Sequence, residues 1–272
     1  MGAVLISAAE LREELAANKI HLLDVRWALG DPDGPQHYLD GHIPGAVFVD
    51  LETELAAAPS PARGRHPLPD PGTFEKCARS WGLGADEPVV VYDATGGMAA
   101  ARAWWLLRWA GVDNVRILDG GLPAWTASGA ELATGAEPDP SPGDLVVRPG
   151  ALPVIDADAA AKWSGVLLDA RAGERFRGEV EPVDPQAGHI PGAVSAPTAE
   201  NLYPTGHFRT AEELRERFAE FGDGPVAVYC GSGVTAAHEI AALAIAGIDA
   251  ALYPGSWSQW SNDPKRPVAT GA

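Results

Sequence analysis

The chain has only two cysteines, Cys77 and Cys230, among its 272 residues. Two cysteines cannot build a framework of disulfides, which excludes the small disulfide-stapled class of secreted proteins. No apolar run approaches the length of a membrane span, and the first seven residues are too short and too uncharged for a signal peptide. We therefore expect a protein of the reducing cytoplasm, in which both cysteines remain thiols.

Basic residues are also scarce, since 20 lysines and arginines against 37 aspartates and glutamates give a net charge of -17. Nucleic acids and anionic membranes bind basic faces, so neither is expected as a partner. Grouped Cys and His ligands and Walker-type glycine patterns are missing as well, so we expect no metal and no nucleotide cofactor. Any anion that the protein binds must be held by local donors.

The most informative segment is a cysteine on a glycine-rich loop. Val226–Tyr229 is typical of a buried strand, Cys230 follows it, and the alanine-rich stretch at 235–246 predicts a helix. Backbone N–H groups and the dipole at a helix N-terminus stabilise an anion, so the thiolate of Cys230 is expected to form more readily than that of a free cysteine. The alternative is a buried cysteine that only packs. We favour a nucleophile, and the expected cradle of backbone N–H groups comes from Gly231, Ser232, Gly233, Val234 and Thr235.

The chain repeats itself. The sequence LLDVR at 22–26 matches LLDAR at 167–171, and GHIPGAV at 41–47 recurs letter for letter at 188–194. A third match aligns VVVYD at 89–93 with VAVYC at 226–230, so that Asp93 stands where Cys230 stands in the second copy. A carboxylate at a helix N-terminus is well stabilised, but it is a poor partner for an anionic ligand.

Each copy alternates apolar strands with helices. Continuous apolar runs such as 88–92 suit strands that are buried on both faces, which predicts an α/β fold with a parallel sheet flanked by helices. The stretch 129–150, rich in Pro, Gly and acidic residues, is typical of a linker. We therefore expect an N-terminal domain at 1–128 and a C-terminal domain at 151–272.

These motifs resemble the tandem-domain rhodanese family, the thiosulfate and 3-mercaptopyruvate sulfurtransferases. The resemblance covers nearly the whole chain and is carried by both GHIPG segments, by CGSGVTA at 230–236 and by GSWSQW at 255–260. It implies two rhodanese-like domains, a non-catalytic one at 1–128 and a catalytic one at 151–272, because the first domain of the family commonly has an acidic residue in place of the cysteine, as Asp93 is here. It also implies an enzyme of the EC 2.8.1 class. Such an enzyme moves a sulfane sulfur from an anionic donor, through a persulfide on Cys230, to cyanide or to a thiol such as thioredoxin.

The resemblance also implies the other site residues. Arg175 occupies the position of the family's substrate arginine, and a guanidinium can bind a carboxylate or a sulfonate-like group with two hydrogen bonds. Ser232, His66 and Asp50 match a serine, histidine and aspartate of the mercaptopyruvate enzymes, where they would relay a proton to or from a thiol donor. The alternatives are a solvated arginine and an exposed loop histidine.

Two clues about the sulfur donor disagree. Mercaptopyruvate enzymes usually have a second substrate arginine downstream of the first, and this chain offers Val183 or Asp184 there. Thiosulfate enzymes usually carry basic residues directly after the cysteine, whereas Gly231 and Ser232 are neutral. The sequence therefore predicts sulfur transfer and leaves both donors open.

Two rival functions remain. A cysteine-dependent phosphatase shares the general fold, but it needs an arginine six positions after the cysteine, where this chain has Ala236. A non-catalytic scaffold that binds or senses persulfides would need no donor site. Residues present in both copies, such as Arg26 with Arg171 and His42 with His189, are expected to be structural.

Overall fold

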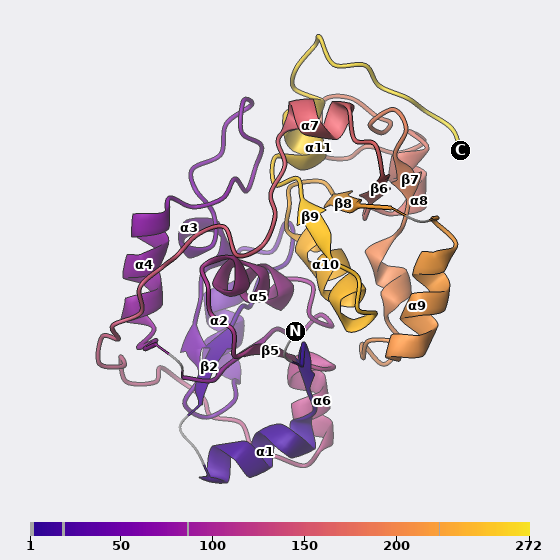
Figure 1. The fold of residues 1–272 in the computed structure, drawn as a ribbon. Helices are drawn as coiled ribbons and strands as arrows, with labels where there is room; N and C mark the ends of the chain where they lie inside the picture. Colours follow the sequence, from indigo (N-terminus) through magenta and orange to yellow (C-terminus); the bar gives the residue numbers. More distant parts are fainter. Residues whose placement is uncertain (1–2, 18–19, 86, 223) are drawn as a thin grey trace. The chain divides into compact units, whose positions relative to one another are not determined.

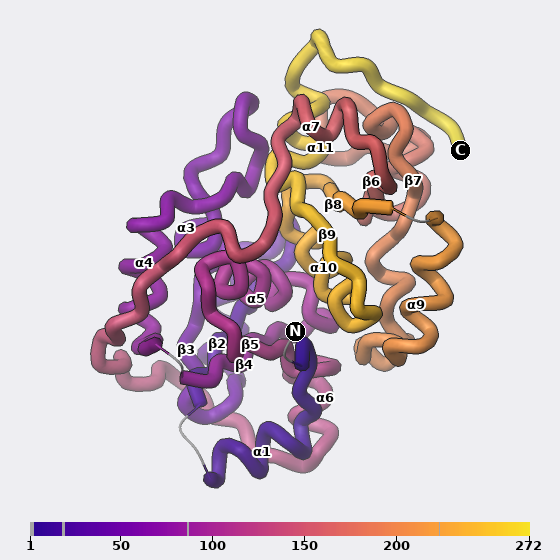
Figure 2. Tube along the Cα trace, in the orientation of Figure 1, coloured from indigo at the N-terminus to yellow at the C-terminus, as the bar shows by residue number. Residues whose placement is uncertain are grey.

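The protein is described by a computed structural model that covers residues 3–17, 20–85, 87–222 and 224–272. Its residues form two compact units. The first contains Met1–Ala56, Pro69–Leu152 and Pro204–Phe208, and the second contains Ala57–Leu68, Pro153–Tyr203 and Arg209–Ala272. Each unit thus includes one short segment from the other half of the sequence, which can be followed along the chain in Figure 2.

The first unit is built on a five-stranded parallel sheet with the strand order β1-β5-β4-β2-β3. The strands are β1 (Leu5–Ile6), β2 (His21–Asp24), β3 (Val47–Phe48), β4 (Val89–Tyr92) and β5 (Val115–Leu118). All four residues of β4 are buried, as the continuous apolar run predicted.

The helices that the described part of this unit forms are α1 (Ala8–Ala17), α2 (Gly34–Asp40), α3 (Leu51–Glu54), α4 (Pro71–Ser80), α5 (Ala100–Trp109) and α6 (Gly121–Ala127). Ser7 and Glu10 cap α1 reciprocally, because each side chain accepts the backbone N–H of the other residue. Leu11 of α1 and Trp125 of α6 pack with Val90 in one apolar core cluster. Helices therefore bury the faces of the sheet, as expected for an α/β fold.

The second unit has a four-stranded parallel sheet with the order β7-β6-β8-β9. Its strands are β6 (Val166–Asp169), β7 (Val194–Ser195), β8 (Val226–Tyr229) and β9 (Ala250–Leu252). Its helices are α7 (Ala157–Ala161), α8 (Gly173–Phe176), the 3-10 helix η1 (Thr198–Asn201), α9 (Ala211–Ala219), α10 (Thr235–Ile245) and α11 (Ser256–Trp260). Helix α10 packs against β8 and β9 (Figure 1). Trp257 and Trp260 of α11 lie in the apolar core of the unit.

The repeat seen in the sequence is also a repeat of contacts. The backbone N–H of Ile43 donates to the hydroxyl of Tyr92, and that of Ile190 donates to the hydroxyl of Tyr229. His42 lies against Tyr38 in the first copy. These contacts hold the GHIPG turn against the sheet, which confirms its structural role.

The second copy keeps the arrangement, with His189 hydrogen-bonded to the carbonyl of Phe176 and stacked on its ring. The arginines match too: Arg26 binds Asp24 and the carbonyl of Gly41, and the buried Arg171 binds Asp169 and the carbonyl of Gly188. Arg171 is therefore a buried ion-pair partner of Asp169, which confirms the structural role expected of it. Within the described residues, no helix is long and apolar enough to cross a membrane.

Candidate active site

Cys230 lies at the carboxyl end of β8, on the loop that leads into α10. Its Sγ accepts a hydrogen bond from the backbone N–H of Gly233, with 3.1 Å between sulfur and nitrogen. Cys230 is buried, with 1% of its surface exposed, and Ser232 beside it is 7% exposed. The sulfur is thus buried beneath the loop residues, and the backbone N–H of Gly233 stabilises negative charge on it.

The loop contains a glycine, Gly233, that no other residue replaces without strain. Gly233 has φ +84°, and a β-carbon there would lie 2.7 Å from the carbonyl oxygen of Pro254. That backbone atom cannot move aside as a flexible side chain could. The glycine is therefore required for the close approach between the loop and the segment after β9.

Helix α11 fixes the other side of the loop. The carbonyl oxygens of Cys230 and Gly231 accept the N–H groups of Trp257 and Ser258, each at 2.9 Å. The N–H of Cys230 donates to Oγ of Ser256, a residue that itself has φ +53°. Sequence analysis counted this segment, 255–260, among the family motifs but missed the part of Ser256 and Ser258, because serine forms such bonds in loops of every kind.

Ser232 and His66 meet at the loop. His66 belongs to the segment Ala57–Leu68, which is part of the second unit. Its Nδ1 lies 2.8 Å from Oγ of Ser232, and both side chains are buried. A histidine bonded to a serine hydroxyl is suited to moving a proton.

The third residue expected with them, Asp50, belongs to the first unit and begins α3. Its carboxylate accepts the backbone N–H groups of Glu52 and Thr53 at 2.8 and 3.3 Å. Asp50 is therefore an N-cap of this helix. Its part in a proton relay stays a prediction.

Arg175 lies on α8 and is engaged by two carboxylates. Its Nη2 is 2.7 Å from Oε1 of Glu181 and 3.3 Å from Oδ2 of Asp184. The guanidinium is directed at the catalytic loop, since a β-carbon at Gly231 would lie 3.5 Å from Nη1 of Arg175. Arg175 is therefore not a free surface arginine.

A second arginine, which sequence analysis missed, lies at the same place. Nη2 of Arg65 would be 3.0 Å from a β-carbon at Gly231, and Nη1 of Arg65 pairs with Oδ1 of Asp184. The only signal in the sequence was its place next to His66. The sequence does not reveal such a contact, because the spacing of residues in a loop does not fix where the loop folds.

In the first copy, the corresponding loop is occupied by the protein's own carboxylate. The two oxygens of Asp93 accept the N–H groups of Thr95, Gly97, Ala99 and Ala100 at 2.8 to 3.0 Å. A carboxylate held by four donors fills the cradle that would otherwise be available to an external anion.

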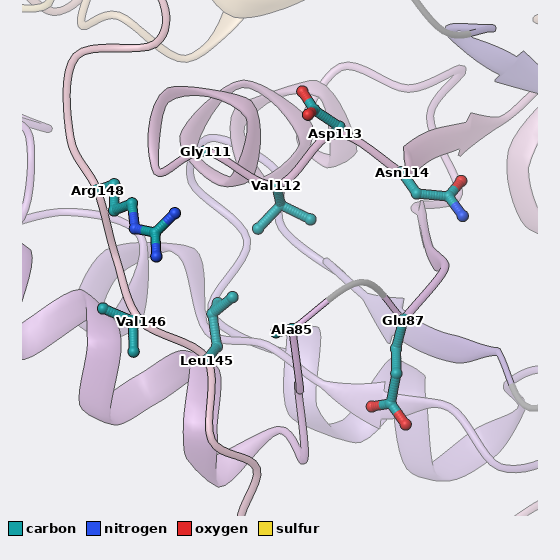
Figure 3. Close-up of a pocket in the computed structure, with 9 residues that line it drawn as sticks. All are labelled: Ala85, Glu87, Gly111, Val112, Asp113, Asn114, Leu145, Val146 and Arg148. Carbon is teal, nitrogen blue, oxygen red and sulfur yellow. The ribbon is translucent and has the colours of Figure 1, made fainter.

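The first unit also contains a cavity of about 320 Å³, shown in Figure 3. Val112 points into it from one side, and Leu145 and Val146 line another. The carboxylate of Glu87 is directed away from the centre. No candidate site residue is among those that line this cavity, so we assign it no part in the reaction.

Comparisons with known proteins agree with this arrangement. The model of the rhodanese-like domain matches twice, at residues 7–128 and 155–263. SseB of Mycobacterium tuberculosis, whose name includes the words thiosulfate sulfurtransferase, is 49% identical over 99% of this chain and 98% of its own length. A Pseudomonas aeruginosa protein named a probable 3-mercaptopyruvate sulfurtransferase is also 49% identical, over 99% of both chains.

Among solved structures, SseA from Escherichia coli, whose title describes the rhodanese fold and 3-mercaptopyruvate sulfotransferases, superposes with a TM-score of 0.82. It is 36% identical, and the match covers 94% of this chain and 99% of that one. Both matched segments contain a parallel sheet flanked by helices, as predicted. The chain therefore belongs to the rhodanese family, as a two-domain sulfurtransferase.

Proposed function

We propose that Cys230 carries the transferred sulfur as a persulfide. The observation that carries this proposal is the hydrogen bond of 3.1 Å from the N–H of Gly233 to Sγ of Cys230, at the start of α10. A donor at this distance stabilises the attacking thiolate and the anionic persulfide that follows it. The domain proposed as catalytic starts after the linker, at residue 151, and uses His66 from the segment at 57–68.

The first half-reaction takes sulfur from an anionic donor. With thiosulfate, the Cys230 thiolate attacks the outer sulfur, the S–S bond breaks, and sulfite leaves with the electron pair. With 3-mercaptopyruvate, the thiolate attacks the thiol sulfur, the C–S bond breaks, and its electron pair goes to the enolate of pyruvate, which takes up a proton. Each route leaves Cys230 as a persulfide and splits a difficult transfer into two steps.

Only the mercaptopyruvate route has a proton to manage within the donor. The pair of Ser232 and His66, 2.8 Å apart, supports a relay that moves this proton between the donor thiol and the enolate. Asp50 is proposed as the third member of the relay. This pair is the observation that favours the thiol donor over thiosulfate.

Arg175 is proposed to bind the negative group of either donor. The guanidinium lies against Gly231 of the loop, and its planar fork matches the oxygens of a carboxylate and of thiosulfate. The backbone N–H groups of Gly231, Gly233, Val234 and Thr235 are proposed to complete the anion site. The persulfide then passes its outer sulfur to cyanide, giving thiocyanate, or to a thiol such as that of thioredoxin in the cytoplasm.

Steady-state formation of thiocyanate tests the proposal. Wild-type protein is expected to turn over at least one of the two donors with cyanide as acceptor, and Cys230→Ser is expected to be inactive. Cys77→Ser is the matched control, because Cys77 lies on α4 of the first unit. Activity that survives in Cys230→Ser contradicts the proposal, as does hydrolysis of an aryl phosphate that depends on Cys230.

A further inference from the structure

The first unit has a pocket at the carboxyl ends of two neighbouring strands of its sheet. Arg26, Trp27 and Ala28 follow β2, Ala94 and Thr95 follow β4, and all five residues line a cavity of about 300 Å³. From β2 the chain passes to β3 on one side of that strand and then crosses to β4 on the other. Ligands of open α/β sheets bind at such a reversal of strand order, so the pocket lies where a binding site is expected.

Two stacked pairs of rings show which residues correspond in the two units. The ring of Tyr38 stacks on that of His42, with 4.0 Å between their centroids, and the ring of Phe176 stacks on that of His189 at 3.7 Å. Nδ1 of each histidine also lies within 2.9 Å of the carbonyl oxygen of its aromatic partner. Since both histidines belong to the repeated GHIPG segment, Tyr38 corresponds to Phe176.

The two units differ in the charged groups at this place. The residue before the stacked aromatic ring is Arg175 in the second unit and His37 in the first. Asp93 stands in place of Cys230, and its carboxylate accepts the N–H groups of its own loop. An anion in the pocket of the first unit would lack the arginine and would meet a carboxylate instead. This pocket is therefore not a second site for an anionic sulfur donor.

The positive charge of Arg26, which lines the pocket, is matched inside the unit. Its guanidinium binds both carboxylate oxygens of Asp24, which is fully buried. It also donates to the carbonyl oxygens of His37 and Gly41. Arg26 therefore holds the surrounding backbone, as expected of a structural arginine, and does not make the pocket positive.

Two carboxylates at the pocket remain in contact with solvent. The side chain of Asp31 is 38% exposed, and Asp40 is exposed as well. The backbone N–H of Asp33 and the ring of His37 lower the pKa of the Asp31 carboxyl, so it is ionised at neutral pH. The imidazole of His37 carries a charge only when it is protonated. The charges that face a ligand here are therefore mainly negative.

The rest of the lining is apolar. The indole N–H of Trp27 donates to Glu52 at 3.2 Å, so Trp27 offers ring surface to a ligand rather than a hydrogen-bond donor. Ala28 and Ala94 add methyl groups, and Leu29, which follows Ala28 in a tight turn, is 61% exposed. An indole ring attracts cations over its face, and this attraction adds to that of a carboxylate.

We propose that this pocket of the first unit binds a small organic cation, an amine with a short apolar body. The ammonium group would meet Asp31 and Asp40, and the carbon atoms would lie against Trp27. The duplicated sheet keeps the crevice, and the changed residues select a ligand of the opposite charge to the sulfur donor. The proposal goes beyond sulfur transfer and does not depend on a persulfide at Cys230.

Backbone amide chemical shifts of isotope-labelled wild-type protein test the site. The probes are n-butylammonium, the neutral n-butanol and the anionic butyrate, at one ionic strength and one pH. We expect n-butylammonium to shift the amide resonances of Trp27, Ala28, Ala94 and Thr95 until they saturate. We expect n-butanol to bind about tenfold more weakly, since it lacks the attraction to two partly screened carboxylates, and butyrate to leave these resonances unchanged.

Substitutions separate the charge from the cavity. Asp31→Asn is expected to weaken binding of n-butylammonium about fivefold, and Trp27→Leu about threefold, as fits a half-exposed charge and an exposed aromatic contact. Asp33→Asn is the matched control, because Asp33 is exposed nearby and is not among the residues that line the pocket. We expect it to leave binding unchanged. Ala94→Leu fills the pocket without changing any charge and is expected to abolish binding.

Thermal unfolding of each variant shows whether the first unit is intact. If Ala94→Leu does not fold, the comparison of Asp31→Asn and Trp27→Leu with Asp33→Asn decides. Shifts that spread evenly over the acidic surface overturn the proposal, because they report attraction to the net charge alone. Equal binding of butyrate and n-butylammonium overturns it too, as does an Asp31→Asn variant that binds as the control does.

Discussion

Nδ1 of His66 lies 2.8 Å from Oγ of Ser232, and this pair stands beside the nucleophile at the Cys230 loop. A proton relay is needed for a thiol donor and not for thiosulfate. Ser232→Ala and His66→Ala are therefore expected to lower kcat/KM for 3-mercaptopyruvate by about 100-fold, within the range of general acid–base catalysis. The same variants are expected to change thiosulfate turnover by a much smaller factor, as measured with cyanide as the common acceptor. Equal losses with both donors would dismiss the relay.

Arg175→Ala is expected to raise KM for either donor by roughly tenfold or more, because a charge-assisted hydrogen bond is lost. Since the arginine binds the ground state and the transition state alike, kcat/KM is expected to fall more than kcat. Arg177→Ala is the matched control: Arg177 lies two residues away and pairs with Glu179 at the surface. Kinetics that match the control would remove Arg175 from the site.

Gly233→Ala is expected to destabilise the second unit more than Gly247→Ala. Both glycines have φ above +80°, so each alanine adds strain of about 1–2 kcal/mol. Only Gly233 also meets a backbone carbonyl, whereas a β-carbon at Gly247 has nothing within 4 Å. Thermal unfolding of the two variants measures the difference. Equal melting temperatures would show that the close approach to Pro254 is not needed.

The buried carboxyl of Glu239 is expected to make the free energy of unfolding depend on pH. This buried residue of α10 accepts a hydrogen bond from Asn201, while its Oε1 has no partner among the described residues. Burial raises its pKa from 4.5 to about 7, with Arg217 opposing the shift and Glu200 adding to it. The folded state therefore binds the proton more tightly than the unfolded chain does. The protonated carboxyl of Glu239 therefore contributes its whole stabilisation to the free energy of unfolding below pH 4.5. This stabilisation is lost as the pH rises to about 7, and it stays low at higher pH.

Glu239→Gln is expected to remove this decline, which is on the order of 3 kcal/mol. Denaturant unfolding at pH 5 and pH 8 measures it, and Glu212→Gln, at an exposed position of α9, is the control. The variant at Glu239 is expected to gain stability relative to wild type as pH rises. If Glu239→Gln and the wild type change in stability by the same amount between pH 5 and pH 8, the assignment is refuted.

Much of the fold was predictable because the sequence repeats. The strands β4 and β8 were expected from apolar runs and the helix after Cys230 from its alanine-rich composition, and the structure confirms all three. The structural roles of Arg171 and His189 followed from their presence in both copies. A duplicated contact is visible in a sequence because both partners recur together.

The contacts that are unique to one copy were harder to predict. Arg65 reaches the loop only because the segment Ala57–Leu68 packs with the second unit, although it lies within the first half of the sequence. Ser256 and Ser258 hold the loop through single hydrogen bonds. No periodicity marks such residues, since the backbone geometry of a loop decides where they point.

The persulfide itself is tested most directly by intact mass. Protein is incubated with each donor in turn, without an acceptor, and desalted before measurement. Wild-type protein and Cys77→Ser are expected to gain the mass of one sulfur atom with at least one donor, and cyanide is expected to remove it. Cys230→Ser is expected to gain nothing. A gain of sulfur in Cys230→Ser, or none in the wild type with either donor, would contradict a persulfide on Cys230.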